Sequence, residues 1–73
     1  MRITILGLSK TIRDILIDDY GMYIKSYSDT HITFTSDVSI KTLPDCIELY
    51  FYQAGETYES RIMLCDYWRI EIE

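Results

Sequence analysis

The chain is poor in the residues that build metal and catalytic sites. Its 73 residues include one histidine, His31, and two cysteines, Cys46 and Cys65. One histidine cannot form the His pair of a zinc site, and two cysteines are too few for the disulfide framework of a small secreted domain. We therefore expect no metal, no cofactor and no enzymatic activity. The two cysteines are expected to be buried or half-buried structural thiols, with a redox switch as the alternative.

Long apolar runs and turn residues are also scarce. No stretch approaches the ~20 residues of a membrane helix, and the chain starts without the basic and apolar regions of a secretory signal. Three glycines, one proline and a hydrophobic fraction of 48 % are typical of a folded chain, not a disordered one. We expect one small globular domain spanning residues 1–73, in the cytoplasm and away from membranes.

Basic residues are fewer than acidic ones, and the whole difference lies in the second half of the chain. Twelve acidic and seven basic residues give a net charge of -5. Residues 1–41 are neutral overall, so residues 42–73 hold the whole excess. This field repels nucleic acid and attracts basic surfaces, which predicts a basic protein partner and no direct binding of nucleic acid.

The first half of the chain alternates between strand and helix patterns. A strand is predicted over residues 2–6 and ends at Gly7, and an amphipathic helix is predicted over residues 10–20. Ser9 or Thr11 can cap the start of this helix, and Gly21 stands where a left-handed residue would end it. Period-two patterns then predict strands over residues 22–27 and 31–35, with a short edge segment around residues 38–41.

The second half contains a predicted hairpin. Residues 46–53 and 57–64 both alternate, and a four-residue loop over residues 54–57 keeps their apolar faces matched. This register pairs Ile47 with Leu64, Tyr50 with Arg61 and Tyr52 with Glu59, and sets the two cysteines opposite each other. A two-residue turn at residues 54–55 also keeps parity and would separate the cysteines. The tail, residues 67–73, alternates again.

The order of these elements predicts an α+β fold. We expect a two-layer domain in which one helix packs on a mostly antiparallel sheet of four to five strands, in the order β-α-β-β-β-β. Because only one helix is available, the second face of that sheet is expected to stay open.

Two local patterns are candidate sites of chemistry. The segment Gly7–Thr11 between a strand and a helix is a poor match to a phosphate-binding loop, since that pattern requires glycine where the chain has Thr4 and Ser9. His31 is predicted on an outward strand position, as a surface histidine. Neither pattern favours an enzyme.

Tyrosine is the residue in excess. There are seven, and the predicted alternation turns five of them outward, at positions 23, 27, 50, 52 and 67. Tyrosine offers a large contact area with a polar tip, which suits an exposed strand and also a binding surface. We predict that the partner binds at Tyr50, Tyr52 and Tyr67 together with the carboxylates Glu48, Glu59, Glu71 and Glu73.

These features favour a small acidic protein that occludes a basic surface of a nucleic-acid-processing protein. In size, charge and aromatic content the chain is similar to the acidic inhibitors that phages and mobile elements direct against host enzymes, including anti-CRISPR and DNA-mimic proteins. One alternative is a structural or regulatory homodimer formed through open sheet faces or edge strands. Others are a phosphate or small-ligand domain using Ser9, Lys10 and Thr11, and a single-strand binder that stacks bases on tyrosines.

Overall fold

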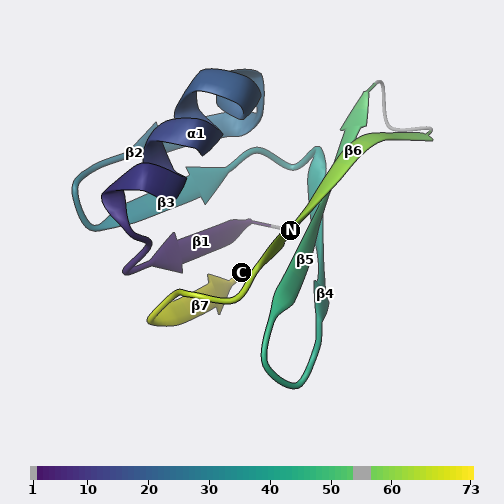
Figure 1. Cartoon of the computed structure of the whole chain (residues 1–73). Coiled ribbons are helices and arrows are strands. Elements are labelled where there is room, and N and C mark those ends of the chain that lie inside the picture. The colour runs from purple at the N-terminus through teal and green to yellow at the C-terminus, as the bar shows by residue number, and fades with distance from the viewer. Residues whose placement is uncertain (1, 54–56) are drawn as a thin grey trace.

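The described residues form seven short strands, one α-helix and one 3-10 turn. The computed structural model describes residues 2–53 and 57–73, and the side chains of residues 53–59 lie outside the description (Figure 1). In chain order the elements are β1 (Ile3–Leu6), α1 (Lys10–Tyr20), the 3-10 turn η1 (Gly21–Tyr23), β2 (Ile24–Tyr27), β3 (His31–Phe34), β4 (Val38–Thr42), β5 (Ile47–Gln53), β6 (Thr57–Leu64) and β7 (Arg69–Ile72).

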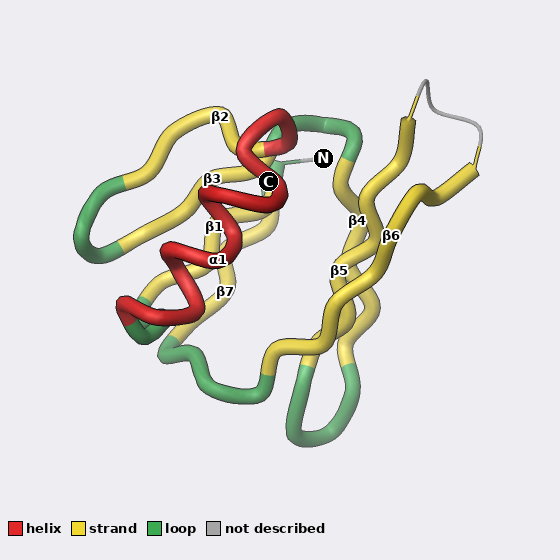
Figure 2. Tube along the Cα trace, turned by 45° about the horizontal axis from the view of Figure 1, so that its top comes forward, coloured by secondary structure: helices red, strands yellow, loops and turns green. Residues whose placement is uncertain are grey.

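The strands form two sheets, and the expected single sheet is therefore wrong. The first sheet has four strands in the order β2-β3-β1-β7, and the second has three in the order β4-β5-β6. All pairings between these strands are antiparallel. The second sheet stands beside the first at a steep angle, and α1 lies across the first sheet (Figures 1 and 2). β4 with β5 and β5 with β6 are antiparallel neighbours in sequence, so short connections are enough to build this sheet without extending the first one.

One core joins the helix and both sheets. The first sheet contributes Ile3, Ile5, Ile32 and Phe34, the second contributes Val38, Ile47, Leu49, Phe51 and Leu64, and the helix contributes Leu16. Phe51 lies at the junction: its ring centroid is 4.2 Å from that of Tyr20, 5.1 Å from that of Tyr23 and 6.1 Å from that of Phe34. The helix and the second sheet therefore bury the same face of the first sheet.

Ser9 sets the start of α1, and the two glycines near this helix differ in backbone conformation. The side chain of Ser9 caps the helix by accepting a hydrogen bond from the Ile12 backbone N–H at 3.3 Å, so the first of the two predicted caps is confirmed. Gly21 has φ -55°, so the predicted left-handed end is wrong, and the chain continues right-handed into η1. The left-handed glycine is Gly7, with φ +78°, in the turn between β1 and α1.

The 3-10 turn changes the place of one tyrosine. Residues 22–27 were predicted as one strand with Tyr23 turned outward, but β2 begins only at Ile24. Tyr23 belongs to η1, is 6 % exposed and packs against Phe51. Residues 21–23 form a helical turn and do not follow the two-residue alternation of a strand. Extending the alternation of β2 back to Tyr23 therefore predicts the wrong side for its side chain.

The predicted hairpin register is confirmed over most of its length. Ile47 pairs with Leu64 and Tyr50 with Arg61, but the register shifts between Phe51 and Tyr52, so Tyr52 pairs with Tyr58 and not with Glu59. The predicted edge segment is β4, which pairs with β5. The predicted loop, residues 54–57, lies largely outside the described residues.

The two cysteines meet at the base of the hairpin. Cys46 and Cys65 form a disulfide with a Cα–Cα distance of 4.2 Å across 19 positions of sequence. The two expected structural thiols are therefore joined to each other, and the predicted register that sets them opposite each other is confirmed. No helix in the described part of the chain is both long enough and apolar enough to cross a membrane.

Candidate binding surface

The outward side of the three-stranded sheet gathers most of the tyrosines predicted to bind a partner. Ile47, Leu49 and Phe51 of β5 are fully buried, so the residues between them point to the opposite side. The neighbouring strands add the residues paired with these positions. We call this surface the tyrosine face and define it by Ser39, Lys41, Glu48, Tyr50, Tyr52, Arg61 and Met63. No described helix or strand lies over it (Figures 1 and 2).

A buried carboxylate lies among the residues of this face. Glu48 is 9 % exposed, and its register partners are Lys41 on β4 and Met63 on β6. Arg61 Nη1 donates to Glu48 Oε2 at 3.3 Å. Pairing stabilises a carboxylate that has lost most of its water, and it holds the guanidinium in place across the hairpin.

The two tyrosines of this face are half-buried, which restricts their motion. Tyr50 lies between Ser39 on β4 and Arg61 on β6 in the strand register. The Tyr52 hydroxyl lies 3.5 Å from Ser39 Oγ, at the outer limit of a hydrogen bond. Side chains that are already ordered lose little entropy on binding, so these rings can serve as contact anchors.

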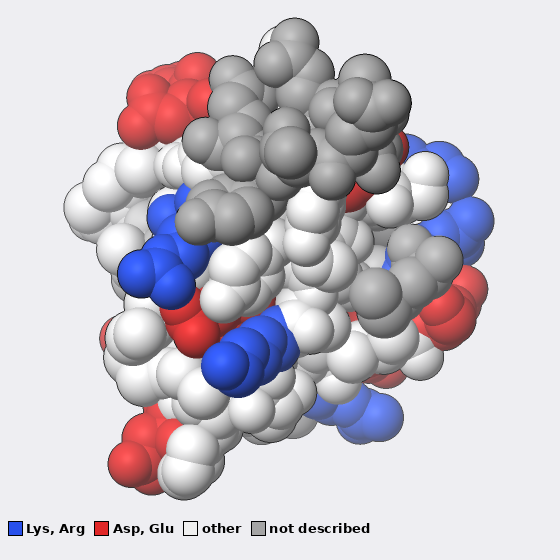
Figure 3. Space-filling model, turned by 90° about the vertical axis from the view of Figure 1, so that its right-hand side faces the viewer, with Lys and Arg blue, Asp and Glu red and all other residues white. Residues whose placement is uncertain are grey.

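The charges on the tyrosine face differ from the predicted pattern. Its described charged residues are the bases Lys41 and Arg61 and the single acid Glu48, and Figure 3 shows this side of the molecule. Exposed carboxylates stand at the strand ends instead: Asp37 before β4, Asp45 between β4 and β5, and Asp66 after β6. The face therefore has tyrosines and bases within the sheet and acids at its ends.

The other predicted binding residues do not join this face. Glu71 belongs to β7 of the four-stranded sheet, and Glu73 follows that strand. Glu71 pairs in register with Thr4, and Glu73 exchanges backbone hydrogen bonds with Arg2 at 2.9 and 3.0 Å. Tyr67 is half-buried and packs against the core. The structure thus brings together Tyr50, Tyr52 and Glu48, and separates Tyr67, Glu71 and Glu73 from them; the side chain of Glu59 lies outside the described residues.

Sequence reasoning left four residues of the tyrosine face out of the predicted site: Ser39, Lys41, Arg61 and Met63. Ser39, Lys41 and Met63 face outward because β4 and β6 flank β5 on its two sides. The alternation of β6 already marked Met63 as outward. Ser39 and Lys41 could be recognised only from the position of β4 beside β5, and alternation alone does not predict which strands are neighbours.

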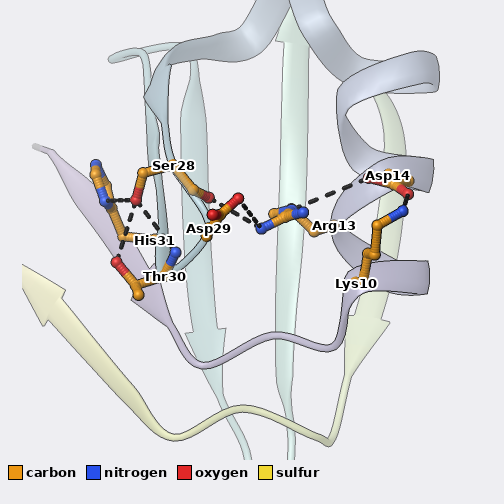
Figure 4. Close-up of polar contacts among 7 residues, drawn as sticks. All are labelled: Lys10, Arg13, Asp14, Ser28, Asp29, Thr30 and His31. Atoms are coloured by element: carbon orange, nitrogen blue, oxygen red, sulfur yellow. Dashed lines mark hydrogen bonds and ion pairs between the residues drawn. The ribbon is translucent and has the colours of Figure 1, made fainter.

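A second polar cluster surrounds the turn between β2 and β3. The Ser28 hydroxyl lies 2.8 Å from His31 Nδ1, and the Thr30 backbone N–H donates to Ser28 Oγ at 3.2 Å. Arg13 on α1 donates to the Ser28 carbonyl oxygen at 3.2 Å and lies 3.4 Å from Asp29 (Figure 4). These contacts fasten the turn to the helix. His31 lies on β3 as predicted, but it is half-buried.

The start of α1 uses its polar groups within the fold. Ser9 Oγ accepts from the helix backbone, and Lys10 Nζ lies 3.0 Å from Asp14 Oδ2. The serine and the lysine that a phosphate would need are thus both engaged. Among the described residues there is no group of three or more His, Cys, Asp or Glu side chains placed to hold a metal ion.

Comparison with known proteins identifies no relative. No family model matches the chain, and neither a curated protein nor a solved structure matches it.

Proposed function

We propose that the protein is a small acidic binding protein without enzymatic activity that occludes the surface of a basic protein by docking its tyrosine face. The observation that carries the proposal is the uncovered β4-β5-β6 surface, on which Tyr50 and Tyr52 are half-buried beside the Glu48–Arg61 ion pair. Ordered aromatic side chains next to an arginine are the usual composition of the energetic centre of a protein interface.

The basic character of the proposed partner rests on the charge of the chain. A net charge of -5 attracts a cationic surface from a distance and speeds the first encounter. Once docked, the exposed carboxylates at the strand ends, Asp37, Asp45 and Asp66, would meet basic groups around the contact. Lys41 and Arg61 would meet carbonyl or carboxylate oxygens of the partner nearer its middle.

The partner class that fits these charges is a nucleic-acid-processing protein. Such proteins carry cationic grooves for phosphate, and an acidic protein seated in one would exclude the nucleic acid without any chemical step. Inhibition by occlusion, of the kind found in phage-encoded inhibitors, is therefore the proposed mechanism.

A cytoplasmic location completes the proposal, because most nucleic-acid processing in a cell takes place in that compartment or its nuclear equivalent. The Cys46–Cys65 disulfide gives this part a direct test, since reducing compartments keep most thiol pairs open. Rapid alkylation of thiols in intact cells should find both cysteines labelled. A pair that stays bonded in cells would contradict the proposed compartment.

The docking proposal is tested by comparing tyrosines inside and outside the face. The Tyr50→Ala/Tyr52→Ala double variant and wild type serve as baits in lysate of the cell that makes the protein. Tyr27→Ala is the matched control, because Tyr27 is 59 % exposed but lies on β2 of the other sheet. We expect a basic protein to bind wild type and Tyr27→Ala at stoichiometric amounts, and to bind the double variant at least about tenfold more weakly, as loss of two aromatic anchors requires.

Two results would overturn the proposal. One is a partner retained equally by the double variant, provided that circular dichroism shows all baits to be folded. The other is a captured partner whose nucleic-acid binding is unchanged by saturating amounts of the protein.

A further inference from the structure

We propose that two copies of the chain pair through β7, the open edge of the four-stranded sheet, and that the charges of this strand fix the register of the pairing. This inference rests on a strand of the other sheet and is independent of the tyrosine face.

The two edges of the four-stranded sheet are built differently. The sheet ends in β2 on one side and in β7 on the other. The register of β2 against β3 shifts between Ile24 and Ser26, and Lys25 stands at the irregularity. Bulges and lysines are devices that discourage pairing at an edge. β7, in contrast, pairs regularly with β1 from Arg69 to Ile72, and no described strand lies on its far side (Figure 1).

Backbone direction decides which residues of β7 face the open edge. Glu73 exchanges both backbone hydrogen bonds with Arg2, so its polar groups point toward β1. Because this direction alternates along a strand, Glu71 also points toward β1, whereas Ile70 and Ile72 direct their N–H and C=O groups to the open side. A second antiparallel strand must therefore bond to Ile70 and Ile72.

The side chains of β7 then select one register around a twofold axis. If Ile70 pairs with Ile70 of the second copy, Arg69 stands opposite Glu71 of that copy, twice by symmetry. Moving the pairing by two residues sets Arg69 opposite Arg69, or Glu71 opposite Glu71, and like charges in directly opposed positions are unfavourable. Shifting the pairing by an odd number of residues would set Ile70 and Ile72 opposite residues such as Glu71, whose N–H and C=O groups point toward β1. The hydrogen bonds between the two copies could then not form. The register centred on Ile70 is the one near the middle of the strand that opposes only unlike charges.

Exposure of these residues agrees with a contact there. The side chains of Arg69 and Glu71 are 62 % and 51 % exposed and form an ion pair with each other at 3.8 Å, so a second copy paired at this edge would exchange that contact for unlike pairs across the interface. Ile72 is 52 % exposed and Trp68 is 73 % exposed. In the register centred on Ile70, the position opposite Ile72 is Trp68 of the second copy, just before its β7. The Trp68 backbone N–H donates to Leu6 O of its own sheet at 2.9 Å, so this position brings two exposed apolar side chains together without adding that N–H to the new ladder.

The test exchanges the charges of β7 in the full chain and measures mass by sedimentation velocity from micromolar to millimolar concentration. Arg69→Glu opposes Glu to Glu, and Glu71→Arg opposes Arg to Arg, so each single variant should dimerise at least about tenfold more weakly than wild type. The double variant Arg69→Glu/Glu71→Arg restores unlike pairs and should dimerise like wild type. An equimolar mixture of the two single variants should form a heterodimer, because it too opposes only unlike charges.

A matched control and a local probe accompany the test. Lys25→Glu makes the same kind of charge change on β2, the other edge of the sheet, and should leave the dimer unchanged. Trp68 is the single tryptophan of the chain, so its emission should shift to shorter wavelength as the wild type dimerises. A wild type that stays monomeric, single variants that dimerise as well as wild type, or a mixture that forms no heterodimer would each overturn the proposal.

Discussion

The two sheets differ in how far along the chain their partners lie. In the β4-β5-β6 sheet each strand pairs with the next one in sequence, and a disulfide closes the base of the β5-β6 hairpin. In the four-stranded sheet the central strand β1 pairs with β3 on one side and with β7, at the far end of the chain, on the other. The β4-β5-β6 sheet is thus assembled from local contacts, and the four-stranded sheet depends on the β1–β7 contact, which closes only when the whole chain is folded.

This difference assigns separate roles to the two sheets. The locally paired sheet carries the tyrosine face, so the proposed binding surface stands on strands that follow one another in sequence. The sheet with distant pairings carries the open edge at β7. Because Phe51 joins the two sheets in one core, we expect the sheets to unfold together at equilibrium. We expect them to differ in the free energy of local unfolding, which amide hydrogen exchange measures.

Phe51→Ala should have the largest effect, because it removes the contact that joins the sheets. Its ring is fully buried and touches Tyr20, Tyr23 and Phe34. We expect the free energy of unfolding in urea to fall by about 3–5 kcal/mol, as for other buried phenylalanines. Tyr27→Ala, at an exposed position, should change it by less than about 0.5 kcal/mol. Loss of structure in the β4-β5-β6 sheet alone would show that the sheets fold independently.

Replacing both cysteines should weaken the local sheet. The disulfide closes a loop spanning 19 positions, and loops of this size contribute about 3 kcal/mol by restricting the unfolded chain. In Cys46→Ala/Cys65→Ala, amide exchange should accelerate first in β5 and β6 and only later in β1. Reduction of the wild type serves as the control and should reproduce the change. Equal acceleration in both sheets would remove the contrast between them.

Gly7→Ala should weaken the other sheet by a smaller amount. Gly7 has φ +78°, and a Cβ there would overlap Trp68 Cβ, so an alanine would both strain the backbone and displace Trp68, the residue before β7. We expect a loss of about 2 kcal/mol in the free energy of unfolding. Gly21→Ala is the matched control: its φ is -55° and no atom lies within 4 Å of the added Cβ, so it should be neutral or slightly stabilising. Similar losses in both variants would contradict the backbone argument.

The sequence allowed the local sheet to be predicted better than the distant one. Alternation and parity predicted that Tyr50 pairs with Arg61 and that the cysteines face each other, because those constraints act between neighbouring strands. They could not predict that β1 lies between β3 and β7, since several arrangements of the strands satisfy the same patterns.

The same limit applies to the candidate site. Alternation correctly placed Tyr50 and Tyr52 on one surface, and it assigned Glu48 to that surface without indicating that the carboxylate would be largely buried. It grouped Glu71 and Glu73 with them only because a single sheet was expected. Residues that point outward from different sheets lie on different surfaces of the molecule. The alternation of a strand does not indicate which sheet that strand joins.

The hydrogen bonds between Arg2 and Glu73 determine how the molecule would respond to mechanical force. β1 and β7 are antiparallel and begin their pairing at these two residues, so a pull applied through them would open the ladder like a zipper, one bonded pair at a time. Such a geometry yields at lower force than one in which all bonds are sheared at once. The four-stranded sheet would peel from its open edge first, while the Cys46–Cys65 crosslink would keep the segment between the two cysteines out of the extended chain.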